Sequence, residues 1–417
     1  MPTATPRSVW PGVMRATATA LLFASTVSAE AQRTTPAAVS VASMLGASDH
    51  LDAATREQGE ALYRDACAAC HDTGANRAPH GSMLAFMVPE AVLRAVTSGP
   101  TKTQAAALSP DQRRVVAAFV THRKLGTADV AAPPLRCNGT AARFDRAEQP
   151  AFAGWGLDAG GGYAIPADVA EIDRSNLAKL HLKWAIGFRG ALSARSQPAL
   201  AAGAIFVGSG DGTVFALDRE TVCARWTFHA AAEVRTGIVV SPWKAAERAL
   251  VFFGNLVGHT YAVDAFTGNL VWQKTIDGHP SATSTGTPAL FRNTLYVSVS
   301  SYEEVPGSGA QYACCTSRGS LVALDSRTGA KGWRRYTIDA PATLRGKNSA
   351  GTDRFGPSGA PIWSSPLVDA ARGQIYVTTG DNYSSQSSGL SDAVIAIDLR
   401  SGAIRWTRQV LARHRLQ

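Results

Sequence analysis

The chain has 417 residues, of which 45% are hydrophobic and 18% charged, a composition typical of a globular protein long enough for two or more domains. It contains no run of 18 apolar residues, which argues against a membrane-spanning helix. The formal net charge is +9, but the 41 basic residues are scattered along the chain. Nucleic acid is therefore not an expected partner.

The first 29 residues have the pattern of an export signal. Arg7 and Arg15 give it a positive start, "ATATALLFAST" is a short apolar core, and "VSA" ending at Ala29 resembles a cleavage site. We therefore expect export to a bacterial periplasm, an oxidising compartment that suits a chain with six cysteines. Residues 30–54 are expected to form a flexible segment before the first domain.

The stretch "YRDACAACHDTG" places Cys67, Cys70 and His71 in the spacing C-x-x-C-H. Each thiol can form a thioether with a haem vinyl group, and the histidine that follows can bind the iron. A redox dithiol would not need the histidine. A zinc site would need a second ligand pair, which does not occur before Cys137. The motif therefore predicts covalently attached haem c.

Helical patterns surround this motif and predict a small all-α cytochrome c domain over residues 55–126. The three predicted helical segments are 55–71, 89–99 and 109–126. In the third segment we expect Ser109 as the N-cap and Gly126 as the stop. Residues 127–150 contain prolines and show no periodicity, so they are expected to form a linker.

A repeat dominates residues 151–417. It reads "ALDRETVCARW", "AVDAFTGNLVW", "ALDSRTGAKGW" and "AIDLRSGAIRW", and a degenerate copy ends at Trp184. The Asp and Trp pairs are Asp218 and Trp226, Asp264 and Trp272, Asp325 and Trp333, and Asp398 and Trp406. We interpret each copy as a strand that ends in Asp, a turn, and a strand whose Trp packs between neighbours. Another strand precedes each copy, so the region is expected to be an all-β propeller with about four blades.

A haem domain followed by such blades resembles the quinohaemoprotein alcohol dehydrogenases, which depend on pyrroloquinoline quinone (PQQ). The resemblance rests on "GWGLDAGGGY", "LAKLHLKWAIGF", "AEVRTGIVVSP", "QYACCTSRGSLVALD" and "GDNYSSQSSGLSDAVIAIDLRSG", and it is greatest to the cytochrome-fused polyvinyl-alcohol dehydrogenases. It implies PQQ and Ca²⁺ beside haem c, and oxidation of a polymeric or small alcohol, polyvinyl alcohol being the implied substrate. Electrons would pass from quinone to haem and then to a soluble periplasmic cytochrome or another acceptor.

The resemblance also implies which residues hold PQQ, a flat tricarboxylate that needs arginines and an aromatic floor. Arg235 in "EVRTG" matches the family's carboxylate-binding arginine, and Arg318 in "TSRGS" is a second candidate. Trp363 matches the stacking tryptophan, and Thr287 stands where the family has a hydroxyl near the quinone. A surface salt bridge is the alternative role for each arginine, and core packing is the alternative for the tryptophan.

For Ca²⁺, which binds oxygen ligands, the resemblance implies a glutamate and a later amide. Glu303 or Glu304 in "SSYEEVPG" fits the glutamate, and Asn382 in "TTGDNYS", together with Asp381, fits the second position. The metal would polarise the reacting carbonyl of the quinone. The alternative is that these are ordinary solvated loop residues.

Four cysteines lie outside the haem motif. Cys314 and Cys315 are adjacent, and a trans peptide holds Cα atoms about 3.8 Å apart, below the roughly 4.4–6.8 Å of ordinary disulfides. Their pairing therefore predicts a distorted peptide bond, whereas two unpaired thiols are the alternative. In quinoproteins such a ring lies over the quinone. Cys137 and Cys223 are expected to pair and to tie the linker to the first blade.

The chain departs from the family at the second axial ligand of the haem. Relatives carry a Met after "SG-x", but Thr101 stands there and Lys102 is no better substitute. Met83 and Met87 are the nearby alternatives, with His80 behind them, although Met87 could simply pack against the haem. Without a Met ligand we expect high-spin haem of lowered potential.

The second departure concerns the propeller, which has eight blades in the family. There the catalytic aspartate follows the fourth repeat, whereas here "RWTRQV" is followed only by "LARHRLQ". We therefore expect a C-terminally truncated and inactive chain with exposed strand edges, which leaves the catalytic residue unassigned. The competing functions are a non-catalytic propeller scaffold with a haem electron-transfer domain, or a soluble cytochrome with a broken fusion partner.

Overall fold

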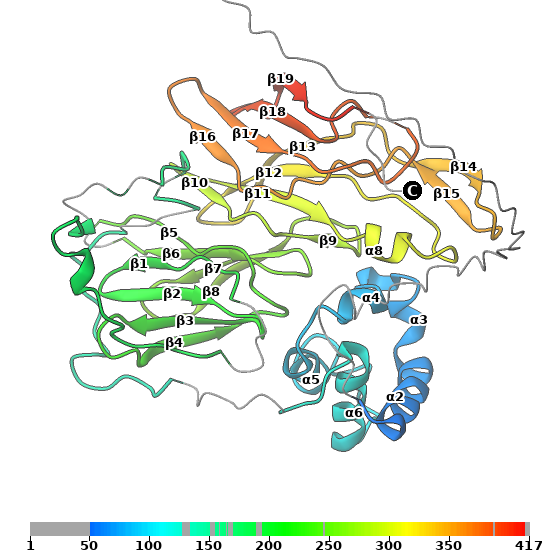
Figure 1. Ribbon diagram of the computed structural model, residues 1–417, viewed down its shortest axis with the longest axis horizontal. Helices are drawn as coiled ribbons and strands as arrows, with labels where there is room; N and C mark the ends of the chain where they lie inside the picture. The colour runs from blue at the N-terminus through cyan, green and yellow to red at the C-terminus, as the bar shows by residue number, and fades with distance from the viewer. Residues whose placement is uncertain are drawn as a thin grey trace, which may run out of the picture. The chain divides into compact units, whose positions relative to one another are not determined.

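The computed structural model describes residues 51–126, 134–150, 155–157, 159–163, 165, 170–188, 194–244, 247–386 and 388–412, all within one compact unit. Figure 1 colours the N-terminal helices blue to cyan and the sheets that follow green to red. No helix in these ranges is both long and apolar enough to cross a bilayer. The expected signal sequence lies outside the described residues.

The N-terminal region is all-α, as expected. Its helices are α2 (Ala53–Ala66), α3 (Ala68–His71), α4 (Gly81–Leu84), α5 (Pro89–Thr97) and α6 (Pro110–Thr121), with a 3₁₀ turn at Ala75–Arg77. Helix α6 begins at a capping box, in which Ser109 Oγ accepts from the Gln112 amide and the Gln112 side chain accepts from the Ser109 amide. Helix α6 packs against both α2 and α5, so the Ser109 N-cap and the three-helix core are confirmed.

The end of α6 differs from the prediction that Gly126 stops the helix. The helix ends at Thr121, whose hydroxyl donates to the Ala117 carbonyl at 2.8 Å. The C-cap His122 takes a left-handed conformation with φ of 55°, which non-glycine residues adopt uncommonly but histidine more often than most. His122 therefore turns the chain out of the helix before Gly126 is reached.

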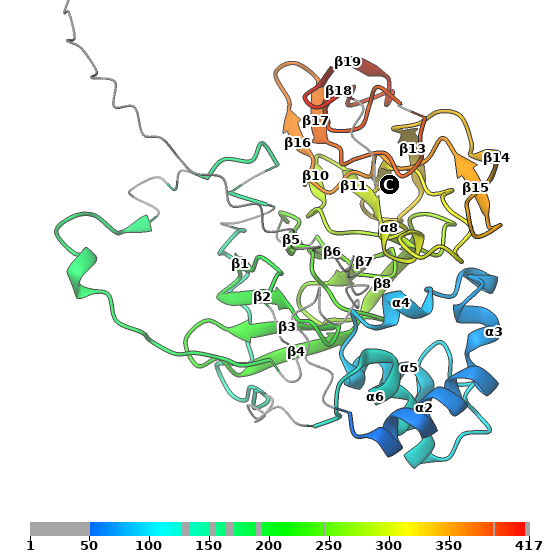
Figure 2. The same cartoon turned by 45° about the vertical axis from the view of Figure 1, so that its right-hand side comes forward.

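The rest of the fold consists of antiparallel four-stranded sheets, here called blades 1 to 4 in chain order. Blade 1 contains β1 (Ala199–Ala201), β2 (Ala204–Gly208), β3 (Thr213–Asp218) and β4 (Ala224–His229); blade 2 contains β5 (Val239–Val240), β6 (Leu250–Gly254), β7 (His259–Asp264) and β8 (Leu270–Thr275). Blade 3 contains β10 (Ala289–Phe291), β11 (Thr294–Ser301), β12 (Ser320–Asp325) and β13 (Lys331–Tyr336), with β9 (Ala282–Thr283) paired to β11. Blade 4 contains β16 (Leu367–Asp369), β17 (Gln374–Thr378), β18 (Ala393–Asp398) and β19 (Ile404–Gln409). A separate hairpin, β14 (Thr343–Lys347) with β15 (Asp353–Gly356), is visible in Figure 2, as is the short helix α8 (Glu304–Gly307).

The repeated Asp closes the same turn in every blade. In blade 1, Asp218 Oδ1 accepts from the Thr221 amide at 2.9 Å and from its hydroxyl at 2.7 Å. The corresponding Thr or Ser in blades 2, 3 and 4 makes the same two bonds. Such side-chain bonds fix a turn locally, which explains why this motif recurs and why the predicted strand–turn–strand pattern is confirmed.

The repeated Trp joins one blade to the next. Trp272 Nε1 donates to the Ser326 carbonyl of blade 3 at 3.0 Å, and its ring lies on the turn glycine Gly329, where a Cβ would come within 2.8 Å. Trp184 reaches the Arg219 carbonyl of blade 1 in the same way, although residues 170–188 form no strand. In the last described blade, Trp406 is 45% exposed, against 7% for Trp272.

The predicted linker differs from the expectation in its second half. Residues 134–150 pack along blade 1, where the Cys137 amide donates to the Ala224 carbonyl at 3.0 Å. The ring of Phe144 stacks on Phe206. The disulfide predicted between Cys137 and Cys223 is present. No side chain of this segment is fully buried, so backbone bonds, the disulfide and the Phe144 contact hold it against blade 1.

Substitution of a docking tryptophan should cost stability in proportion to its burial. We expect Trp272→Ala to lower the unfolding free energy by about 3–5 kcal/mol, because it leaves a cavity against blade 3. The matched change Trp406→Ala should cost much less because that ring is half exposed. Urea unfolding of both variants measures the difference, and equal losses would show that blade-to-blade docking is not what the ring contributes.

The turn aspartate should make stability depend on acid pH. Burial would raise the pKa of Asp218, but hydrogen bonds from Thr221 and the Arg225 guanidinium outweigh burial and hold the pKa below its ordinary value. The ionised carboxylate therefore stabilises the fold above the ordinary aspartate pKa, and this stabilisation disappears as pH falls through the lowered value. We expect the unfolding free energy of wild type, measured in urea, to exceed that of Asp218→Asn most at neutral pH and least in acid. A difference in unfolding free energy that does not change with pH would contradict this.

Candidate functional site

The C-x-x-C-H motif opens onto a cavity of about 460 Å³. Cys67 and Cys70 are unpaired and half buried there, and burial together with Cys70 raises the pKa of the Cys67 thiol. Apolar side chains from α4, α5 and α6 form much of the wall: Leu84, Val92, Val96, Val116 and Val120. An apolar cavity behind two thiols and an imidazole has the chemistry that a covalently bound porphyrin requires.

His71 is oriented for metal binding. Its Nδ1–H donates to the Pro79 carbonyl at 2.6 Å, so Nε2 is left as the ligand atom. A ligating histidine usually donates its other ring N–H to a carbonyl or carboxylate, which fixes the tautomer and the ring plane. This contact supports the prediction that His71 binds iron.

The two methionines proposed as the second iron ligand have different surroundings in the structure. Met87 and Thr101 both line the haem cavity, whereas Met83 is not among its lining residues. Met83 is 3% exposed and packs in the apolar cluster behind the cavity. His80 bonds to Ser82 within the turn before α4. Of the two methionines, Met87 is the one whose side chain lines the cavity.

The propeller completes the wall of this cavity. Ala231, Val257, His259 and Thr275 line it from blades 1 and 2. The guanidinium of Arg77, from the loop after the haem motif, bonds to the Val257 carbonyl at 3.1 Å and to the Asp277 carbonyl at 2.7 Å. Arg94 of α5 bonds to the Asp211 carbonyl in blade 1. The haem cavity is therefore closed by contacts between the two domains.

Trp363 and Arg235, predicted to bind PQQ, meet around one residue that the sequence did not single out. Tyr302 follows β11, and its ring lies 5.3 Å from the Trp363 ring at 66°. The Arg235 guanidinium contacts the Tyr302 hydroxyl and lies 5.9 Å from the centre of its ring. These three side chains form what we call the aromatic platform.

Thr287 and Arg318 are positioned differently from Trp363 and Arg235. The Thr287 hydroxyl accepts from the Gly237 amide at 2.7 Å, so it ties blade 2 to blade 3. Thr285, not predicted, has its hydroxyl 3.3 Å from the Trp363 carbonyl. The Arg318 guanidinium donates to the carbonyls of Ile338 and Asp339 and lies over the Tyr336 ring. No contact of Thr287 or Arg318 with the platform is found among the described residues.

The two acids proposed for calcium have different surroundings. Glu303 accepts from the backbone amides of Thr316 and Ser317. Burial would raise its pKa, but hydrogen bonds from His279 and Ser317 outweigh burial and lower it. Burial raises the pKa of Glu304 to about 7, and Glu304 Oε2 is a buried oxygen with no hydrogen-bond partner.

Asp381 and Asn382 lie on the loop after β17, and Asp381 is near Glu304. The Asp381 carboxylate is close enough to raise the pKa of Glu304 by repulsion. The Asn382 side chain donates to the Ser391 hydroxyl at 2.8 Å. The neighbouring Tyr383 hydroxyl donates to the Ser301 carbonyl at 2.8 Å and is near enough to Glu304 to lower its pKa, against the larger effect of burial. Within the described ranges, no three or more His, Cys, Asp or Glu side chains are grouped as a metal site. A cation at Glu304 would therefore need further oxygen ligands of another kind.

Cys314 and Cys315 are joined, as predicted, and the peptide bond between them is cis. Thr316, the next residue, bonds to Glu303 through its amide at 2.9 Å, while Tyr302 contacts Trp363. The disulfide and the indole therefore lie near the same end of β11, on loops that the Tyr302–Glu303 turn connects.

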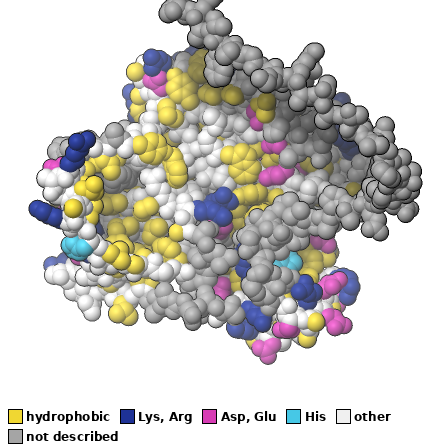
Figure 3. Space-filling model, in the orientation of Figure 1, with side chains coloured by type: hydrophobic (Ala, Val, Ile, Leu, Met, Phe, Trp, Pro, Cys, Tyr) yellow, Lys and Arg dark blue, Asp and Glu magenta, His cyan; other side chains and the backbone are white. Residues whose placement is uncertain are grey.

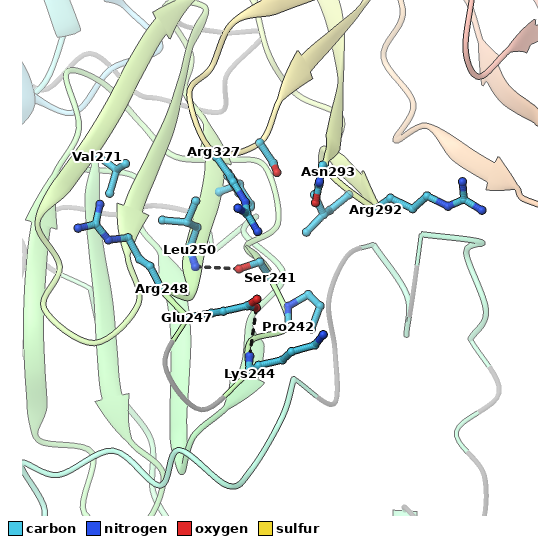
Figure 4. Close-up of a pocket in the computed structure, with 13 residues that line it drawn as sticks. Ser241, Pro242, Lys244, Glu247, Arg248, Leu250, Val271, Arg292, Asn293 and Arg327 are labelled. Carbon is cyan, nitrogen blue, oxygen red and sulfur yellow. Dashed lines mark hydrogen bonds between the residues drawn. The ribbon is translucent and has the colours of Figure 1, made fainter.

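Another cavity, of about 650 Å³, lies between blades 2 and 3 and is lined by none of the predicted site residues. Figure 4 shows Arg248, Arg327 and Lys244 around it with Glu247. The three basic side chains are exposed, and Leu250 and Val271 line the same cavity. On the face drawn in Figure 3, Lys and Arg are dispersed among acidic and hydrophobic side chains, in keeping with the scattered charge of the sequence.

Comparison with known families now identifies the class of protein. A family model described as "Glucose/ethanol/alcohol dehydrogenase, beta-propeller domain" (PQQ) matches residues 160–415. A second, "Cytochrome C oxidase, cbb3-type, subunit III", matches residues 54–120. The chain belongs to the PQQ-type dehydrogenase propeller family and carries a cytochrome domain, so the predicted family and fold class are confirmed.

Individual relatives point to one branch of this family. The polyvinylalcohol dehydrogenase of Sphingopyxis sp. is 32% identical, covering 97% of this chain and 62% of its own length. A polyvinylalcohol dehydrogenase of Pseudomonas sp. is 32% identical over 84% of this chain and 57% of its own. The quinohemoprotein alcohol dehydrogenase of Comamonas testosteroni is 26% identical over 68% and 42%. The chain thus spans less than two thirds of each of these relatives.

Several site residues had weak signals in the sequence. Tyr302 precedes the two glutamates and Tyr383 follows Asn382, so both stood inside motifs already noted. His259 of β7 carried no signal, because only the docking of the two domains brings it to the haem cavity.

The Arg77 contacts should hold the domains together. Arg77→Ala removes two hydrogen bonds to partly buried propeller carbonyls, so we expect the unfolding free energy to fall by about 1–3 kcal/mol. Arg64→Ala, on the exposed face of α2, is the matched control and should be nearly neutral. Urea unfolding measures both, and an Arg77→Ala variant as stable as the control would show that these bonds do not contribute.

Proposed function

We propose that this protein is a quinohaemoprotein dehydrogenase that oxidises secondary alcohol groups, polyvinyl alcohol being the proposed substrate. Electrons from the alcohol pass through haem c to an external one-electron acceptor such as a soluble cytochrome. Export to the periplasm through residues 1–29 belongs to the same proposal, since c-type haem and an external carrier suit that compartment.

One observation carries the proposal. Met87, which lines the haem cavity, and Trp363 of the aromatic platform pack into a single apolar cluster that spans both domains. A scaffold propeller with an unrelated cytochrome would have no reason to place an indole, an arginine and a joined cysteine pair at the loops that face the haem domain. Electron transfer between two cofactors needs two sites held close together, and this apolar cluster borders both proposed sites.

The residues present fit a flat polycarboxylate. Arg235 has five N–H donors, so its guanidinium can hold a ligand carboxylate as well as the Tyr302 hydroxyl. Three buried hydroxyls near these loops, Thr283, Ser284 and Ser317, have no hydrogen-bond partner, and buried polar groups normally have one. Bound PQQ would supply a two-electron acceptor, while Trp363 and the Cys314–Cys315 pair would hold its faces.

The residues also fit a haem and a calcium ion. Cys67 and Cys70 would form the thioethers, His71 would bind the iron, and Met87 is the proposed second ligand. For calcium, the unpartnered oxygen of Glu304 beside the Asp381 carboxylate is what a hard cation would neutralise. Glu303 already accepts backbone bonds, so we propose Glu304 rather than Glu303 as the ligand.

Calcium should stabilise the quinone-free protein through Glu304. A ligand that binds only the folded state raises the melting temperature, so we expect Ca²⁺ to raise it in wild type and hardly at all in Glu304→Gln. Glu57→Gln, on exposed α2, should respond like wild type. Equal Ca²⁺ responses of wild type and Glu304→Gln in a thermal melt would rule out Glu304 as a ligand.

The proposed activity is tested by following haem reduction. The full chain, loaded with haem, PQQ and Ca²⁺, is mixed anaerobically with a secondary alcohol or with polyvinyl alcohol while the haem absorbance is recorded. The sequence predicts an inactive chain, whereas the proposed site supports activity. We expect the ferrous spectrum to appear with alcohol only when quinone is present, a result that would overturn the prediction of inactivity. Absence of reduction with every alcohol, in protein that dithionite still reduces, would favour the non-catalytic scaffold.

A further inference from the structure

A stacked aromatic pair crosses the boundary between the two domains. Phe86 lies on the turn after α4, and Tyr302 follows β11 of blade 3. Their ring centres are 5.2 Å apart and their planes are inclined by 28°. Tyr302 is only 7% exposed, and Phe86 is partly buried against the same apolar cluster.

Tyr302 borders one of the two proposed cofactor sites, and the residue next to Phe86 lines the other. Tyr302 contacts Trp363 of the aromatic platform, with ring centres 5.3 Å apart. Phe86 is followed directly by Met87, which lines the haem cavity. Neighbouring side chains of one short turn therefore face in two directions, Phe86 toward the propeller and Met87 toward the haem site.

The pair is held in place from both sides. The Arg235 guanidinium contacts the Tyr302 hydroxyl, which fixes the phenol ring in the propeller. The turn that carries Phe86 is closed by bonds from the Phe86 amide to the Met83 carbonyl and from the Met87 amide to the Leu84 carbonyl. Ala232 and Leu256 of the propeller pack in the same cluster. A ring pair fixed in this way keeps one geometry.

We propose that Phe86 and Tyr302 form the electron-transfer junction between the platform and the haem, an inference that rests on the proposed function. Bound PQQ would take up the two electrons and two protons that leave the alcohol when its C–H and O–H bonds break and a carbonyl forms. Phe86 and Tyr302 would carry the two electrons one at a time toward a haem held by Cys67, Cys70 and His71, which would accept one electron at a time, and the protons would pass to solvent. An external one-electron acceptor would reoxidise the haem after each transfer. Electron tunnelling weakens steeply across empty gaps, and the stacked rings fill the gap between the sites.

The test compares variants that remove a ring with variants that keep it. Phe86→Leu and Tyr302→Leu in the full loaded chain should slow haem reduction about tenfold, equivalent to about 1.4 kcal/mol in the barrier. Phe86→Tyr retains the ring and should transfer electrons at close to the wild-type rate. Phe188→Leu, at a stacked pair in blade 1, is the control for loss of a ring elsewhere. The rate is measured by stopped flow with alcohol and, without any alcohol, by pulse radiolysis that follows redistribution of electrons from quinone to haem.

Two further readouts separate the junction from damage to the haem site. The haem absorption spectrum and its reduction potential, measured in the quinone-free chain, should be the same in wild type and in both Leu variants. If wild type shows redistribution and the Leu variants match its rate, the junction proposal is wrong while the proposed function stands. If wild type redistributes electrons after a radiolytic pulse but no alcohol reduces it, the proposed function is wrong and the junction is still tested.

Discussion

The burial of Tyr302 between the cytochrome domain and the propeller is the interaction on which the proposed site depends. Its ring contacts Phe86 on one side and Trp363 on another, while its hydroxyl contacts Arg235. A tyrosine this deeply buried needs a partner for its hydroxyl, and Arg235 supplies one at the place where an anionic ligand is proposed. Tyr302 therefore packs the apolar boundary between the two domains and also holds the charged Arg235 guanidinium in place.

The strand order of the blades explains why Tyr302, Glu304 and Asp381 lie at the same end of the propeller strands. Antiparallel strands place loops alternately at their two ends, and the repeated Asp turns occupy one end of every blade. The opposite ends of β11 and β17 carry Tyr302, Glu304 and Asp381. The haem domain lies against that second end through Arg77 and the apolar cluster. Repetitive turns therefore build the scaffold, and the irregular loops at the other end carry the chemistry.

Local signals made much of this predictable from the sequence. The spacing of Cys67, Cys70 and His71 depends only on the chemistry of attachment, and the Asp–Trp repeat depends only on a turn and a strand. Contacts between segments far apart in the chain were not predictable. Phe86 and Tyr302 are separated by more than half the described chain and form a pair only after docking. The end of α6 was also not predictable, for a local reason. The prediction placed it at a glycine, whereas His122 takes the left-handed conformation that ends the helix.

The central claim is that the haem and the aromatic platform share one wall, and paramagnetism tests it most directly. The full haem-loaded chain is labelled with 5-fluorotryptophan, and fluorine NMR spectra are compared between the ferric state and the diamagnetic ferrous carbonyl state. Trp363→Phe and Trp406→Phe assign the two signals of interest. The account predicts that the Trp363 signal shifts or broadens in the ferric state while the Trp406 signal does not. A Trp363 signal that is the same in both states would contradict it.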